Sequence, residues 1–208
     1  MAKRAPLKTG ELTILPANRA SWEDLQKVLS STAPASCQCQ RYKMQPSECL
    51  VSTSVEERAC RLRAQTSPDT PEAETTTGLL AYLGDEPVGW CAVEPRSGYV
   101  SMVRGGRVAW SGRSEDRTDD TVWAITCFVT RAGFRGRGVS RALACAAVDF
   151  VRQRGGRAVE GYPMTTRNAV SDELHVGTAG IFAAAGFTAV SRPSSRRVIM
   201  RIELEHSR

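Results

Sequence analysis

The sequence has few of the residues from which a metal site is built. Only two of its 208 residues are histidines, and its seven cysteines follow no common paired-cysteine spacing, so zinc binding at Cys37-Gln-Cys39 is disfavoured. An odd number of cysteines without a secretory signal indicates free thiols. We expect Cys91, Cys127 and Cys145, which lie in apolar segments, to be small core residues.

Long apolar runs are also missing. No stretch approaches the about 20 residues that a membrane-spanning helix needs, and residues 1–15 contain no continuous apolar segment of the kind found in signal peptides. A chain of 208 residues with 41% hydrophobic residues can bury one sizeable core. We therefore expect a cytoplasmic protein without a membrane segment, with a single domain over residues 1–208.

Lysine is scarce, although the formal net charge is +6: only four of the 28 basic residues are lysines. Arginine enrichment is found in proteins that bind nucleic acids or acidic substrates. No basic motif interleaved with aromatic residues accompanies the charge, which disfavours nucleic acid as a partner. A base-composition bias of the encoding genome, together with a solvated surface, is the commoner cause of such enrichment.

The most informative segment is a predicted strand that runs through a glycine-rich basic turn into a helix. Residues 122–129 read as a buried strand, and Arg135-Gly136-Arg137-Gly138 follows. Apolar residues then recur at helical spacing: Val139, Ala142, Leu143, Ala146, Ala147, Phe150 and Val151. A helix N-terminus offers free backbone N–H groups and a positive dipole end, and glycines let a ligand approach the main chain, so this turn suits a pyrophosphate.

Three kinds of phosphate site compete for this turn. A P-loop needs Gly-Lys-Ser/Thr, which does not occur here, and the dinucleotide fingerprint needs a glycine where Arg141 stands. The turn resembles the Arg/Gln-x-x-Gly-x-Gly/Ala motif of the GNAT superfamily of acyl-CoA-dependent N-acyltransferases. Arg135 matches the first position and Gly138 the fourth, and Ser140 replaces the final small residue. The alternative is an ordinary strand–turn–helix with glycines for chain reversal.

Two further segments strengthen the resemblance. Residues 157–163 read as the next strand, and 177–187 resembles the closing helix of that family with its terminal Gly186-Phe187. The resemblance covers about residues 78–204 and implies an α/β (α+β) GNAT fold: a central mixed, mostly antiparallel twisted sheet of six to seven strands, flanked by about four helices. Other expected elements are strands at 11–15, 78–83, 87–94, 187–190 and 198–204, helices at 21–29 and 54–65, and polar loops at 96–120 and 165–174.

The resemblance also implies a reaction: direct transfer of an acetyl group from acetyl-CoA, as co-substrate, to an amine. A main-chain N–H of Phe128 or Val129 is then expected to bind the acyl carbonyl. The pyrophosphate of coenzyme A is expected at the turn, on Arg135, Gly136, Arg137, Gly138, Val139 and Ser140.

The general acid does not carry over from the family. Its usual tyrosine position is Phe182, which has no proton to give, and the usual asparagine position is His175. Three nearby candidates remain: Tyr162, His175 as acid or base, and Glu160 as a base acting through water. The alternatives are a packed aromatic for Tyr162, a helix cap for His175, and for Glu160 an orientation away from the reacting groups.

The acceptor is expected to be a small-molecule amine. In the family, acceptor specificity is set by variable segments, which here are residues 33–48, 96–120 and 163–174. Tyr99 and Trp110 are candidates for an apolar acceptor pocket, with loop anchoring as the alternative for Trp110. A protein N-terminal or lysine amine, and a non-catalytic acyl-CoA-binding module, are the competing functions, and a homodimer is an open alternative to a monomer.

Overall fold

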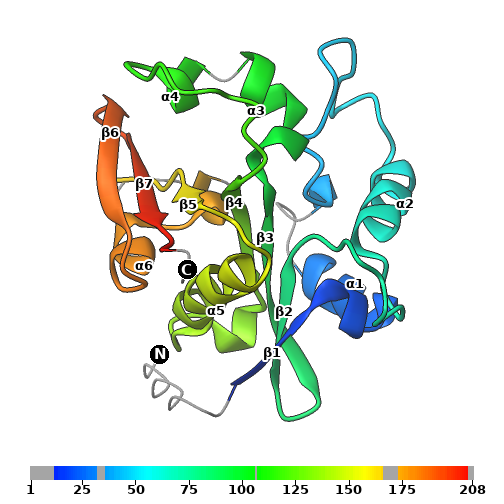
Figure 1. Ribbon diagram of the computed structural model, residues 1–208. Helices are drawn as coiled ribbons and strands as arrows, with labels where there is room; N and C mark the ends of the chain where they lie inside the picture. Colours follow the sequence, from blue (N-terminus) through cyan, green and yellow to red (C-terminus); the bar gives the residue numbers. More distant parts are fainter. Residues whose placement is uncertain (1–11, 32–35, 106, 166–172, 206–208) are drawn as a thin grey trace.

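One seven-stranded sheet forms the centre of the molecule, as the computed structural model shows for residues 12–31, 36–105, 107–165 and 173–205 (Figure 1). The strand order is β1-β2-β3-β4-β5-β7-β6. The β4–β5 pair is parallel and the other five pairs are antiparallel, which confirms the expected mixed, mostly antiparallel sheet. The strands are β1 Leu12–Pro16, β2 Leu79–Leu83, β3 Glu86–Pro95, β4 Val122–Thr130, β5 Ala158–Gly161, β6 Thr188–Ser194 and β7 Arg197–Glu203.

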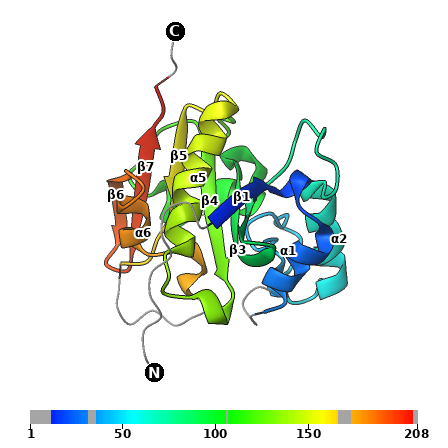
Figure 2. The ribbon, with the colours of Figure 1, turned by 90° about the horizontal axis from the view of Figure 1, so that it is seen from below.

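Helices cover both faces of the sheet, with α5 and α6 on one face and α1 and α2 on the other (Figures 1 and 2). Along β2, Leu79 and Ala81 pack with Leu143 of α5, whereas Leu80 packs with Leu25 of α1, as the two-residue period of a strand requires. No helix among the described residues is both long and apolar enough to cross a membrane. The α-helices are α1 Trp22–Leu29, α2 Val55–Thr66, α3 Val100–Gly105, α4 Arg107–Trp110, α5 Val139–Gln153 and α6 Ala179–Ala183.

Local sequence signals set the starts of α1 and α2. The Ser21 side chain accepts a hydrogen bond from the N–H of Asp24, and the Ser54 side chain accepts one from the N–H of Glu57. Each serine satisfies a backbone donor that the first helical turn leaves without a partner. The helices expected at residues 21–29 and 54–65 are therefore confirmed, to within about one residue at their ends.

The segment 96–120, expected to be a polar loop, contains the helices α3 and α4. This expectation was wrong because tertiary packing, rather than local periodicity, stabilises these short helices. Tyr99, Met102 and Trp110 are buried against Ala124 of β4 and Ile199 of β7, on the sheet face opposite α5. The indole N–H of Trp110 also donates to the carbonyl of Met102 at 3.0 Å, which joins α4 to α3.

Strand β4 contains one extra residue. Ile125 is paired with Val93 and Cys127 with Ala92, so Thr126 has no partner on β3 and forms a β-bulge. The bulge inverts the alternation of faces in the second half of the strand. Ile125 and Phe128 consequently both pack on the α5 side, whereas Cys127 and Val129 pack on the α1 side.

Candidate active site

The parallel strands β4 and β5 separate halfway along β4. Their pairing begins at Val122–Ala158 and ends at Ile125–Gly161, while β4 continues to Thr130. Beyond Gly161 the chain bends away, and Met164 forms isolated bridges with Thr178 and Arg197. Among the described residues, no strand accompanies β4 past Ile125 on its β5 side, so backbone groups of β4 are available there.

The hydrogen-bond pattern shows which backbone groups these are. The N–H of Arg131 donates to the carbonyl of Val88 on β3 at 3.0 Å. Because N–H directions alternate along a strand, the N–H of Val129 also points to β3, and that of Phe128 points to the open side. The Thr130 carbonyl points the same way as Phe128 and accepts a hydrogen bond from Arg135 Nε at 3.1 Å.

The glycine-rich turn lies between this open stretch of β4 and helix α5. Gly136 and Gly138 have φ values of 72° and 92°, which favour glycine. Gly138 is the N-cap of α5 and has no side-chain cap hydrogen bond. A Cβ atom at either glycine would meet nothing within 4 Å, so the turn is open on that side. The first N–H groups of an α-helix have no acceptor within the helix, so those that begin α5 can bind a ligand there.

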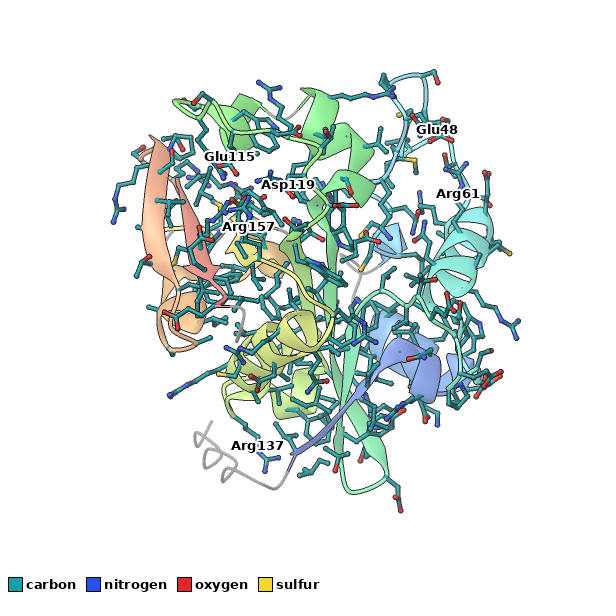
Figure 3. The ribbon with its side chains drawn as sticks, in the orientation of Figure 1. Glu48, Arg61, Glu115, Asp119, Arg137 and Arg157 are labelled. Carbon is teal, nitrogen blue, oxygen red and sulfur yellow. The ribbon has the colours of Figure 1, made fainter. Side chains whose placement is uncertain are left out.

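Neighbouring side chains fix this turn to β4 and β3. Ser140 Oγ lies 3.1 Å from Thr130 Oγ1, and the buried Val139 side chain packs over Gly89 of β3. The Arg137 guanidinium lies over the Phe134 ring at 5.9 Å. Figure 3 shows Arg137 at one end of the molecule and Glu115 toward the other. The structure thus brings all the residues expected to hold the pyrophosphate together at one helix terminus.

Phe182, at the position of the family's usual tyrosine, belongs to the core. It is fully buried and makes edge-to-face contacts with Phe128 and Phe187, at centroid distances of 5.7 and 5.1 Å. Its ring lies where a side chain of Gly161 would start, because a Cβ there would be 2.1 Å from Phe182 Cε1. The end of β5 is therefore shaped by an aromatic ring in contact with a glycine.

This contact predicts that Gly161→Ala lowers the free energy of unfolding by about 1–3 kcal/mol, the usual range for overpacking a core. Gly180→Ala is the matched control, since its Cβ would meet only Thr178 Oγ1, at 4.0 Å. In a helix the control is expected to gain up to about 1 kcal/mol. Urea unfolding measures both values, and equal stability of the two variants would contradict the packing described for Phe182.

Glu160 lies in a buried cluster of ion pairs. Its carboxylate accepts hydrogen bonds from Arg201 at 2.7 Å, from Arg96 at 3.3 Å and from Arg113. Burial alone raises the pKa of Glu160, but the arginines, Arg113 above all, lower it on balance. Tyr162 donates its hydroxyl hydrogen to the same carboxylate at 2.7 Å. Two expected catalytic residues are thus adjacent, with their polar atoms engaged with each other.

Glu115 belongs to the same cluster and joins it to the 96–120 segment. It accepts hydrogen bonds from Arg96 Nη1, Arg113 Nε and Arg201 Nη1, each at 3.0 Å. Burial opposes the shift, but Arg113 and Arg96 lower the pKa of Glu115 to about 2. Figure 3 shows Glu115 near the ion pair of Asp119 with Arg157. Glu115 and Asp119 thus both pair with arginines of the chain.

The aromatic residues considered for an acceptor pocket are buried. Tyr99 is 0% and Trp110 5% exposed. Three guanidinium groups, those of Arg96, Arg113 and Arg117, lie 4.7–5.3 Å from the Trp110 ring centroid. Trp110 therefore anchors its segment to the sheet.

The third expected catalytic residue, His175, lies in the short 3-10 helix η5, Glu173–Val176. Its Nε2 atom is 3.3 Å from the hydroxyl oxygen of Tyr42, and the two rings stack with centroids 6.2 Å apart. Tyr42 comes from the connection between α1 and α2, and sequence reasoning did not identify it. The two residues are 133 positions apart, and no periodic pattern relates them.

The cysteines divide between core and surface. Cys91 and Cys127 are buried as expected, and Trp90 Nε1 donates to the sulfur of the buried Cys39 at 3.2 Å. The expectation for Cys145 was wrong, because it is exposed. It lies two residues from the buried Leu143 of α5, and this spacing turns a helical side chain toward the opposite face.

The divergent parallel strands, the glycine turn and the α5 N-terminus together define a GNAT-type acyltransferase fold. The family model described as "Acetyltransferase (GNAT) family" matches residues 43–176, and the chain belongs to this family. No curated protein matches the sequence.

Solved structures share the fold at low sequence identity. An N-acetyltransferase from Staphylococcus aureus Mu50 has a TM-score of 0.55 at 11% identity, covering 93% of this chain and 99% of that one. YncA, a putative acetyltransferase from Salmonella typhimurium solved with its cofactor acetyl-CoA, has a TM-score of 0.51 at 14% identity, covering 95% and 96%. PaiA N-acetyltransferase from Thermoplasma acidophilum, solved with coenzyme A, has a TM-score of 0.50 at 14% identity, covering 93% and 99%.

Proposed function

We propose that the protein is an acetyl-CoA-dependent N-acetyltransferase that transfers the acetyl group directly to the amine of a small molecule. The observation that carries this proposal is the open stretch of β4 beside the glycine turn of α5, in a chain of the acetyltransferase family. The amine nitrogen forms a bond to the acyl carbon, the carbon–sulfur bond breaks, and the coenzyme leaves as a thiol.

Separate parts of the chain bind the two ends of the coenzyme in this proposal. The turn from Arg135 to Ser140 binds the pyrophosphate through the exposed backbone of Gly136 and Gly138 and the N–H groups that begin α5. The acyl carbonyl accepts the N–H of Phe128, which points to the open side of β4. The N–H of Val129 points to β3, so of the two donors considered from the sequence we favour Phe128.

Closure of the α1 side of the sheet supports a small acceptor. The N–H of Ser101 in α3 donates to the carbonyl of Tyr42 at 3.0 Å, so the 96–120 segment contacts the α1–α2 connection. Lys43, in the same connection, makes a buried ion pair with Glu94 of β3 at 2.7 Å. These contacts cover the sheet on that side, which favours a small amine over an extended polypeptide.

Coenzyme A is expected to raise the melting temperature, because a ligand that binds only the native state stabilises it by mass action. At about 100 times its dissociation constant the gain is about 2.7 kcal/mol, or about 5–10 °C for a chain of this size. Differential scanning fluorimetry measures the shift, with adenosine 3′,5′-bisphosphate as a control that lacks the pyrophosphate and pantetheine. No shift at millimolar coenzyme A would contradict the proposal.

Thiol release from acetyl-CoA over a panel of amines then separates the alternatives. Release with small amines supports the proposal, and release with peptide amines alone identifies a protein acetyltransferase. A melting shift without thiol release for any amine indicates an acyl-CoA-binding module.

A further inference from the structure

The proposed reaction leaves one proton without an assigned donor. The leaving group of acetyl-CoA is a thiolate, and Phe182 at the usual tyrosine position carries no hydroxyl group. Tyr162 donates its hydroxyl hydrogen to the Glu160 carboxylate at 2.7 Å and is 8% exposed. To act as the acid, Tyr162 would have to leave a buried charged partner, which is costly.

The Tyr42–His175 pair lies beside the open stretch of β4. Helix η5, which carries His175, packs on β4. Two residues later, a Cβ at Gly177 would lie 3.1 Å from the Phe128 ring, so this part of the chain contacts the residue whose N–H binds the acyl carbonyl in the proposed function. Cys127, the neighbour of Phe128 on β4, lies within electrostatic range of the Tyr42 hydroxyl.

Contacts at both ends hold the pair in place. The backbone carbonyl of Tyr42 accepts the N–H of Ser101, and the carbonyl of Gly177 accepts the N–H of Met164 at 3.2 Å. The His175 ring stacks on the Tyr42 ring at an interplanar angle of 28°. The hydroxyl group therefore has a fixed position beside a nitrogen that can donate a hydrogen bond to it.

We propose that Tyr42 is the general acid that protonates the leaving thiolate, and that His175 positions Tyr42 and stabilises its phenolate by donating the Nε2–H to it. This inference rests on the proposed function. As the carbon–sulfur bond breaks, the hydroxyl proton of Tyr42 passes to the sulfur. The proton that the amine nitrogen loses on forming the amide returns to the Tyr42 oxygen, so the residue is restored without any further reactant.

The surroundings of Tyr42 fit an acid at neutral pH. Burial raises the pKa of Tyr42, and the positive charges of Arg197 and Arg41 only partly offset this. The hydroxyl group therefore remains protonated until the thiolate forms. His175, at 3.3 Å, and the thiols of Cys127 and Cys37 are further titratable groups that contact or act on it.

Tyr42→Phe tests the proposal, because it keeps the ring and its stacking on His175 and removes only the hydroxyl group. With an amine that the wild type acetylates, kcat is expected to fall about 100-fold or more, the usual contribution of a general acid. KM for acetyl-CoA and the melting shift with coenzyme A are expected to stay within about twofold, since the change leaves the Arg135–Ser140 turn unaltered. Tyr162→Phe tests the competing acid, and kcat is expected to stay within about threefold of the wild type.

His175 is tested by two variants. His175→Ala is expected to lower kcat about 10-fold or more. In His175→Gln the amide N–H can take the place of Nε2–H, so its kcat is expected to lie between those of His175→Ala and the wild type. A Tyr42→Phe enzyme with wild-type kcat, or one that has lost the melting shift, would overturn the inference. A large fall of kcat in Tyr162→Phe alone would instead assign the acid to Tyr162. If the wild type shows the melting shift but acetylates no amine, the proposed function fails and this inference fails with it.

Discussion

Replacing Gly138 by glutamate is expected to weaken coenzyme A binding by at least about 100-fold. A carboxylate at the N-cap of α5 would lie within a few ångströms of the phosphates, and two like charges at that distance near a protein surface repel by several kcal/mol. The open space around Gly138 means that the new side chain meets no steric obstacle from the chain. The effect on binding therefore comes from the charge and bulk of the new side chain against the ligand, and not from a clash within the chain.

Gly155→Glu is the matched control for this prediction. Gly155 has a φ of 70° and open space beyond its Cβ position, as Gly138 does, but it follows the other end of α5. Both variants are expected to lose similar stability, because each places a side chain in a left-handed backbone conformation. Isothermal titration with coenzyme A is expected to separate them, and equal affinities would show that the pyrophosphate is not at the α5 N-terminus.

Replacing Glu160 by glutamine is expected to lower the free energy of unfolding by about 3 kcal/mol. The substitution leaves Arg96, Arg113 and Arg201 in a buried site with one carboxylate fewer, and removing one partner of a buried ion pair typically costs about 3–5 kcal/mol. The remaining pairs with Glu115 keep the loss at the lower end of that range. Urea unfolding at neutral pH measures it.

Glu203→Gln is the control, because this residue also pairs with Arg201, at 2.6 Å, yet its side chain is 62% exposed. An exposed pair of this kind contributes less than about 1 kcal/mol. If both variants lose the same amount, the buried cluster does not stabilise the fold in the way described.

The pH dependence of stability gives a second measurement of the Glu160 cluster. The pKa of Glu160 in the folded protein lies below its ordinary value of 4.5, so its contribution is complete above pH 4.5 and is lost as the pH falls below that value. The pKa of Glu115 is lowered to about 2, so part of its contribution persists further into acid. Glu160→Gln is expected to lose less stability than the wild type on acidification from pH 5 to about pH 3.

Much of the fold could be predicted because its signals are local. The Arg135–Ser140 turn combines glycines that require positive φ with the apolar period of α5, and these two signals identify the same place. In β7 and the residue that follows it, the two-residue period of a strand puts Val198, Met200, Ile202 and Leu204 on one face, and all four lie in or against the α5-side core. Such patterns depend on residues within a few positions of one another.

The rest of the site depends on contacts between distant segments. Alternation along β5 indicates that Glu160 and Val159 point to opposite faces of the sheet. That arginines surround Glu160 becomes visible only in the folded chain, where the 96–120 segment supplies Arg96 and Arg113. That segment has no amphipathic period of its own, so its helices were missed. Tyr42 contacts His175 because the α1–α2 connection and the β5–α6 connection both reach β4. Neither connection contains a sequence pattern that indicates this contact.

The bulge at Thr126 has a consequence for protein engineering. Because it exchanges the two faces of β4, a coenzyme turn transplanted from this chain keeps its orientation only when the extra residue is carried with it. A graft that starts at Cys127 and continues a regular strand lacks the extra residue. It would turn the Phe128 side chain to the opposite face of the sheet and point its N–H to the opposite edge of the strand. The smallest exchangeable unit therefore begins before Thr126 and ends with α5.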